Sequence, residues 1–133
     1  MKTIKKLLFT IVLLVILLIG YFYLYFKNMM DKENVIITGV VYHQNSGNPL
    51  SDVNITIHND RYEDNNGNKN YDEYLGHDIY QVKTNSEGFF LKKIPKSAFV
   101  WIIFNKDGYV DVKEQGKNST LKMNYKVRLF PKK

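Results

Sequence analysis

The residues best suited to chemistry in this sequence lie in one polar tract, NDRYEDNNGNKNYDE, at positions 59–73. When Gly67 is aligned with the sixth position of a calcium loop of the EF-hand type, oxygen-bearing side chains fall at four ligand positions. These are Asp64, Asn66, Asn70 and Glu73. The first position, normally Asp, is Tyr62, and no helices are expected beside the tract. The tract is therefore a candidate calcium loop that lacks its first ligand.

The same tract has a simpler interpretation as the polar tip of a long β-hairpin. Asn66-Gly67 is a strong hairpin-turn signal, because both residue types tolerate a positive φ. Long polar insertions on small scaffolds often carry a binding function. The side chains predicted to contact a protein partner are Asp60, Tyr62, Glu63, Asp72 and Tyr74. The sequence leaves the metal loop and the binding loop open as alternatives.

The rest of the chain offers little catalytic chemistry. There is no Cys, which excludes disulfides, thiol nucleophiles and Cys-ligated zinc. His43, His58 and His77 are the only histidines, and their spacing matches no metal or triad pattern. No G-x-S-x-G motif and no P-loop are present. We therefore expect a protein that is not an enzyme and carries no cofactor, apart from the calcium alternative.

An apolar segment near the N-terminus predicts a membrane span. Residues 7–26 carry no charge, and at about 1.5 Å per residue a helix of this length crosses the apolar core of a bilayer. Lys2, Lys5 and Lys6 precede it, so the positive-inside rule places the N-terminus in the cytoplasm. A cleaved signal peptide is the alternative, but the apolar run is long and no A-x-A-like site follows.

Four regions follow from this segment. They are a basic cytoplasmic N-terminus at 1–6, a transmembrane signal anchor at 7–26, a linker at 27–34 and a β domain at 35–133. We expect a single-pass protein of the cytoplasmic (inner) membrane, with its C-terminal domain on the extracytoplasmic or periplasmic side of the cell envelope.

The net charge of +6 reflects membrane topology more than affinity for nucleic acid. Four lysines flank the apolar segment, and residues 28–133 hold fifteen bases against thirteen acids, a net charge of +2. The charges are unevenly spread, since residues 59–78 carry six acids and two bases. No nucleic-acid partner is therefore expected.

Residues 35–133 show the pattern of an all-β domain. Short segments with period-2 alternation or β-branched residues are separated by turns rich in Gly, Asn and Pro. At 98–104 the run AFVWIIF predicts a strand that is buried on both faces, with Trp101 in the core. At 121–129 strict alternation directs Leu121, Met123, Tyr125, Val127 and Leu129 inward. Together these segments predict an antiparallel β-sandwich of about seven strands.

Four stretches occur in an order that resembles the carboxypeptidase regulatory-like domain family, a small transthyretin-like β-sandwich. They are ITGVVYHQNSGNPLSDVNITI with Gly39, Gly47 and Pro49; TNSEGFF with Gly88; Ile94-Pro95; and NKDGY with Gly108 and Tyr109. The resemblance covers residues 35–129. It implies a Greek-key, transthyretin-like sandwich that acts as an accessory module and not as a catalyst. The segment before Ile94-Pro95 is about one residue shorter than the family pattern, and the tract after Ile57 is longer and more acidic.

The expected function is thus a membrane-anchored, non-catalytic module that recognises or scaffolds a protein partner at the membrane surface. One alternative is a calcium-binding version of the same module. A second is a small transthyretin-like hydrolase, which is disfavoured because the C-terminal Tyr-Arg-Gly-Ser signature of that family is absent and the chain ends YKVRLFPKK.

Overall fold

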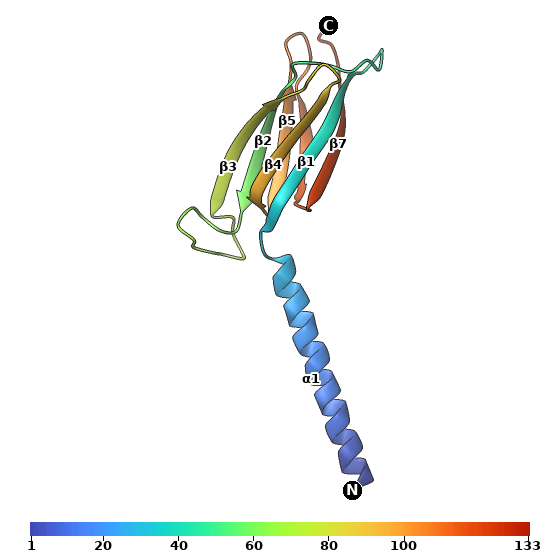
Figure 1. The fold of residues 1–133 in the computed structure, drawn as a ribbon, viewed down its shortest axis with the longest axis vertical. Helices are drawn as coiled ribbons and strands as arrows, with labels where there is room; N and C mark the ends of the chain where they lie inside the picture. Colours follow the sequence, from blue (N-terminus) through green and yellow to red (C-terminus); the bar gives the residue numbers. More distant parts are fainter. The chain divides into compact units, whose positions relative to one another are not determined.

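A computed structural model describes all residues, 1–133, and divides them into two compact units, Met1–Met30 and Asp31–Lys133. The first unit holds one helix, α1 (Lys2–Asn28), in which no residue is buried (Figure 1). By length and composition α1 could cross a membrane, and a signal sequence shares these properties. Only Met29, Met30 and Asp31 lie between α1 and the first strand.

The second unit is a β-sandwich of seven strands, which confirms the predicted all-β fold (Figure 1). The strands are β1 (Lys32–His43), β2 (Asn54–Arg61), β3 (Gly76–Lys83), β4 (Phe89–Ser97), β5 (Phe99–Asn105), β6 (Val112–Asn118) and β7 (Lys122–Leu129). One sheet has the order β4-β1-β7, and the other has the order β3-β2-β5-β6. All pairs are antiparallel except β1 with β7, which is parallel, so the sandwich is mixed and not purely antiparallel.

The core is formed by the inward side chains of the strands, which are every second residue along each strand. On β2 the buried residues Ile55 and Ile57 follow the predicted period of two, and on β7 Met123, Tyr125 and Val127 do the same. The two sheets meet through side chains such as those of Phe90 and Phe104, whose ring centroids lie 5.8 Å apart in an edge-to-face contact.

Gly39 in β1 has a packing reason that the sequence did not reveal. A Cβ at this position would lie 2.5 Å from Cε1 of Phe90 and 2.7 Å from the carbonyl oxygen of Tyr125. The central strand can therefore pass under the Phe90 ring only because residue 39 has no side chain.

Two predictions about the strand faces are wrong. Only one face of β5 is in the core, because Val100, Ile102 and Phe104 are buried whereas Trp101 lies half-buried on the outer face of its sheet. Leu121 is 61% exposed, because β7 starts at Lys122 and residue 121 precedes the paired region. The apolar run at 98–104 thus indicated a buried strand, but it did not show that the opposite sheet covers only one of its two faces.

Candidate functional site

The polar tract forms the connection between β2 and β3, which we call the β2–β3 loop, residues 62–75. The two strands pair from Asn54 with Lys83 to Arg61 with Gly76, so the loop closes a hairpin (Figure 1). Within it, Glu63 and Lys69 form an antiparallel bridge, and the Gly67 amide donates to the Asp64 carbonyl in a turn where Gly67 has a φ of +83°. The predicted hairpin with a turn at Asn66-Gly67 is confirmed, although only Gly67 and not Asn66 has a positive φ.

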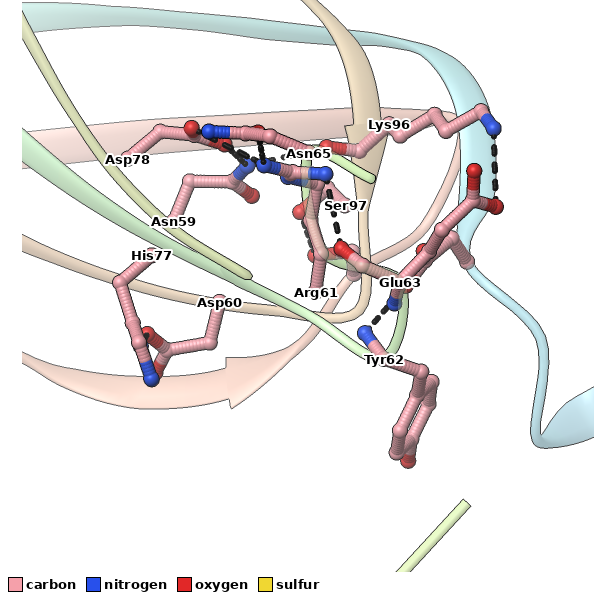
Figure 2. A network of polar contacts seen from close by, with 12 residues as sticks. Asn59, Asp60, Arg61, Tyr62, Glu63, Asn65, His77, Asp78, Lys96 and Ser97 are labelled. Carbon is pink, nitrogen blue, oxygen red and sulfur yellow. Dashed lines mark hydrogen bonds and ion pairs between the residues drawn. The ribbon is translucent and has the colours of Figure 1, made fainter. Parts of the chain in front are cut away.

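The loop is held by an arginine that continues the inward side of β2. After Ile55, Ile57 and Asn59, the period of two turns Arg61 inward, where it is 8% exposed. Its Nε donates to Oδ2 of Asp78 at 2.7 Å, and its Nη2 donates to Oδ1 of the same residue at 3.2 Å (Figure 2). This two-pronged pairing suits the planar guanidinium and fixes its orientation.

The remaining donors of Arg61 hold the start of the β2–β3 loop. Nη1 donates to the carbonyl oxygen of Glu63, and Nη2 donates to Oδ1 of Asn65, both at 2.8 Å. The loop returns over the guanidinium at Gly76, where a Cβ would lie 2.7 Å from Cζ of Arg61 and 2.5 Å from the Glu63 carbonyl oxygen. Glycine is therefore needed at residue 76 for the loop to close on the arginine.

Asn59 joins this network to the opposite sheet. Its Nδ2 donates to Oδ2 of Asp78 at 3.1 Å and to the carbonyl oxygen of Lys96, on β4, at 2.9 Å (Figure 2). Its Oδ1 is buried and has no hydrogen-bond partner. Asn59 and Arg61 together close the end of the core with polar groups from both sheets.

A second set of contacts lies at the rim of the network. Lys96 Nζ donates to Oε2 of Glu63 at 3.0 Å, and Lys69 Nζ lies 3.5 Å from the same oxygen. The carboxylate of Asp31 accepts from the backbone amides of Tyr62 at 2.8 Å and Glu63 at 3.2 Å. The first residues of the loop are thus fixed by side chains from β4 and from the segment before β1.

The contacts of the network favour the ionised forms of Asp78, Arg61 and Glu63. Burial raises the pKa of Asp78, but hydrogen bonds from Arg61 and Asn59 and the charge of Arg61 outweigh it, so the net pKa lies below its ordinary value. The hydrogen bond to Asp78 in turn raises the pKa of Arg61. At the rim, the hydrogen bond from Lys96 is the main cause that lowers the pKa of Glu63.

Two of the four predicted calcium ligands, Asp64 and Asn70, bind backbone amides of the loop with their side-chain oxygens. The Asp64 carboxylate accepts from the amides of Asn66 and Asn68 and from Nδ2 of Asn68, at 2.8 to 2.9 Å. Asn70 Oδ1 accepts from the amide of Asp72 at 2.9 Å, and Glu73 is exposed. No group of three or more His, Asp and Glu side chains is arranged to hold a metal ion.

The predicted partner-contacting residues divide into two groups. Asp60 and Glu63 have partners within the protein, since Asp60 Oδ1 lies 2.7 Å from His77 Nδ1 and Glu63 forms an ion pair with Lys96. Asp72 is exposed, and Tyr62 and Tyr74 are half-buried with ring centroids 5.1 Å apart.

The two tyrosines belong to an aromatic cluster that covers the inner side of the loop. Tyr71 joins it through Tyr62, at 6.5 Å between centroids, and Phe99 on β5 joins it through Tyr74 at 6.0 Å. The outermost ring of this cluster is Tyr71, which is 40% exposed, and the nearby Leu75 is 36% exposed. The cluster packs the loop against β5 and leaves one ring and two acids, Asp72 and Glu73, at the surface.

Four residues that position the loop were not predicted from the sequence: Asn59, Arg61, Asp78 and Asp31. A signal for Arg61 was available, because the alternation of Val53, Ile55 and Ile57 places residues 59 and 61 on the same inward side. Asp78 could be identified only after the hairpin register was known. Asp31 lies in the segment predicted as linker, and no pattern points to its contact with the loop.

The serine and histidine side chains near the network have other partners. The buried hydroxyl of Ser97 contacts the hydroxyl of Ser119, and the partner of His77 is Asp60 (Figure 2). No hydrogen bond in the protein joins a Ser or Thr hydroxyl to a histidine ring. A hollow of about 260 Å³ lies beside Arg61, lined also by Asn65, Asp78, Tyr80, Pro95 and Lys96. The donors of Arg61 that face this region are already used by Asp78 and the loop.

Comparisons with known proteins support the fold and leave the family open. No protein-family model matches the chain, and no curated protein matches it. Among solved structures it is similar to 3-chlorocatechol 1,2-dioxygenase from Rhodococcus opacus, with 18% identity and a TM-score of 0.53 over 74% of this chain and 60% of that one. It is also similar to catechol 1,2-dioxygenase from Acinetobacter, with 8% identity and a TM-score of 0.57 over 74% and 53%.

A third similar structure is the pilus 2b backbone protein of group B streptococcus, with 15% identity and a TM-score of 0.50 over 74% of this chain and 41% of that one. This chain therefore spans 60% or less of the length of each of the three proteins. At such identities the likeness shows a shared β-sandwich fold and nothing more. The carboxypeptidase regulatory-like family remains a resemblance in the sequence.

Proposed function

We propose that this protein is a non-catalytic binding module, anchored in a membrane by α1, whose extracytoplasmic β-sandwich recognises a protein partner through the β2–β3 loop. The observation that carries the proposal is the contrast within that loop. Its base is held by the buried Arg61–Asp78 pair, whereas Tyr71, Asp72, Glu73 and Leu75 are exposed at its far side.

Such a loop is suited to binding because it loses little conformational entropy when a partner binds. The first residues of the loop are fixed by Arg61, Lys96 and Asp31, and its aromatic cluster packs on Phe99. A preorganised loop that presents a tyrosine can bind with a smaller ordering cost than a flexible one. The exposed aromatic and acidic groups favour a partner surface with apolar side chains beside Lys or Arg.

Two features support assignment to an accessory module. The ordered Gly and Pro positions resemble the carboxypeptidase regulatory-like family, and the network holds no nucleophile beside a base. Each histidine has a partner in the fold. His43 accepts from the backbone amides of Asn45 and Ser46, His58 stacks on Trp101, and His77 contacts Asp60. These contacts give each histidine a place in the fold.

The test is photocrosslinking from the loop in native membranes. A photoreactive phenylalanine replaces Tyr71 in the full chain, and a matched control replaces Gln81, which is exposed on β3 of the same sheet. We expect one discrete crosslinked protein from position 71 and none from position 81.

Charge reversal gives the specificity control. Asp72→Lys combined with Glu73→Lys should reduce the crosslink at least tenfold, since like charges at an interface are repulsive. Glu87→Lys, in the exposed β3–β4 turn, should leave it unchanged. Equal crosslinking from positions 71 and 81, or a product that survives the charge reversal, would contradict recognition through the loop.

A further inference from the structure

Between Ile36 and Tyr42 of β1, the outer face of the sheet β4-β1-β7 carries four bases and no acid. Residues paired across strands point to the same side, so Ile36 lies between Lys93 and Lys122, and Val40 lies opposite Lys126. Arg128 pairs with Tyr42 one step further along. We call this outer surface the basic face, defined by Lys93, Lys122, Lys126 and Arg128 together with the apolar residues Phe89 and Leu91.

None of these four bases has an ionic partner in the protein. The ion pairs of the protein involve only Arg61, Lys69 and Lys96 as cations. On the basic face, the Nζ of Lys126 makes a cation–π contact with Tyr42, 5.6 Å from its ring centroid. The outer face of the other sheet is different, because it holds Asp60 paired with His77. The positive charge of the basic face is therefore uncompensated.

Apolar groups are exposed among these bases. Phe89 is 38% exposed and Leu91 is 44% exposed, and both lie on β4 beside Lys93. A hollow of about 280 Å³ lies at Lys93 and is lined also by Asn34, Ile36, Ile94 and Pro95. A surface that combines unpaired bases with exposed apolar side chains has the character of groups that settle at a lipid–water interface.

We propose that the basic face docks onto the surface of an anionic lipid bilayer. The central strand of this sheet, β1, follows α1 after only Met29, Met30 and Asp31, which reach at most about 11 Å when extended. If α1 is the membrane anchor, as the proposed function requires, this short tether keeps the sandwich close to lipid headgroups and raises their effective concentration. Anionic headgroups then supply the counter-charge that the protein does not, and each base contributes about a fivefold gain in membrane affinity.

The experiment measures the distance of two positions from the bilayer in the full chain. Since the protein has no Cys, single variants Asn124→Cys, between Lys122 and Lys126, and Gln81→Cys, on the other sheet, can each carry one fluorophore. Both are placed in nanodiscs that contain headgroup spin-labelled lipid as quencher. One set has 30 mol% phosphatidylglycerol in phosphatidylcholine, and the other has phosphatidylcholine alone.

We expect position 124 to be quenched several-fold more than position 81 in the anionic discs. The difference should disappear in phosphatidylcholine, in 0.5 M NaCl, and in the double variant Lys122→Glu/Lys126→Glu. The matched control Lys83→Glu/Lys113→Glu makes the same charge change on the outer face of the other sheet and should leave the difference in place.

Three results would overturn the proposal. Equal quenching at positions 124 and 81 would mean that the basic face does not approach the lipid. If quenching at position 124 depends on the number of chains per disc and not on the lipid charge, the basic face is covered by a second copy of the chain. Release of the chain from the discs by alkaline extraction would contradict anchoring by α1 itself. In failed docking, by contrast, the chain stays with the disc and only the difference in quenching is lost.

Discussion

At the scale of single residues, Arg61 is the side chain on which the loop most depends. It is a charged group at an inward strand position, where an unpaired ion would be costly. Its bonds to Asp78, Glu63 and Asn65 satisfy the charge and at the same time fix the start of the β2–β3 loop. The same bonds therefore close the end of the core and determine the surface that the loop presents.

Removal of Arg61 should destabilise the sandwich far more than removal of an exposed cation. Arg61→Met leaves Asp78 with only the amide of Asn59 as a donor and leaves two loop acceptors with none. We expect a loss of about 2 to 3 kcal/mol in the free energy of unfolding. The control Lys69→Met breaks an ion pair whose lysine is more than half exposed and should cost about 0.5 kcal/mol or less. Urea unfolding in detergent, followed by the fluorescence of the single Trp101, measures both. Equal losses in the two variants would contradict this role of Arg61.

The pH dependence of stability follows from the lowered pKa of Asp78. Because the folded pKa lies below the unfolded value of about 3.9, the stabilisation is complete above about pH 5 and is lost as the pH falls through the folded pKa. Glu63 shifts in the same direction. We expect the urea midpoint to be flat from about pH 8 to 5 and to fall below about pH 4.

The variant Asp78→Asn isolates this contribution. It should be less stable than the parent chain at neutral pH and should lose less stability between about pH 5 and 2, because its side chain does not titrate. A parallel acid decline in the two proteins would show that Asp78 is not a source of the pH dependence.

At the scale of elements, strict alternation was the most reliable guide in the sequence. β2 and β7 have the predicted inward residues, since a period of two is itself the geometry of a strand with one covered face. The run in β5 was misleading. Its outer residue Trp101 stacks on His58, with ring centroids 3.5 Å apart, and Lys113 Nζ lies 4.3 Å from the Trp101 ring centroid. Neighbouring strands of the same sheet therefore cover this apolar side chain, which no pattern within β5 could show.

The β2–β3 loop was located correctly from its composition, but its internal contacts were not foreseeable. The acids of residues 59–78 looked free in the sequence, yet Glu63 in the loop and Asp78 on β3 bind cations of the protein, and Asp64 accepts from amides of its own turn. Each of these contacts depends on pairing between residues distant in sequence or on the path of the turn. Composition identifies such a loop as polar, whereas register decides which of its charges remain available to a partner.

The calcium alternative makes a prediction at this same scale. Because the Asp64 carboxylate is already satisfied by Asn66 and Asn68, we expect the thermal melting of the full chain to be the same in calcium as in chelator. A site bound at 100 times its dissociation constant would instead add about 2.7 kcal/mol and raise the melting temperature by several degrees. Such a rise, abolished by Glu73→Ala, would establish the metal loop in place of the purely binding one.

At the scale of the whole molecule, the division between an apolar helix and a β-sandwich was evident from composition alone. An uncharged run of bilayer length needs no knowledge of tertiary contacts to be recognised. The asymmetry between the two sheet faces was not evident, because the bases of β7 and Lys93 of β4 come together only through their pairing with β1. Both proposals, a partner bound at the loop and lipid bound at the basic face, depend on a sandwich held outside the membrane by α1.

The most direct test of that account is single-cysteine labelling of the full chain in intact cells. Gln81→Cys reports on the sandwich and Thr3→Cys on the N-terminus, and the chain has no other thiol. With the outer layers of the envelope permeabilised, a membrane-impermeant maleimide should label position 81 at once and position 3 only after lysis. The labelled chain should keep its full mass and stay in the membrane after alkaline extraction. Labelling of position 3 before position 81, or a shortened and soluble sandwich, would contradict the anchored extracytoplasmic module.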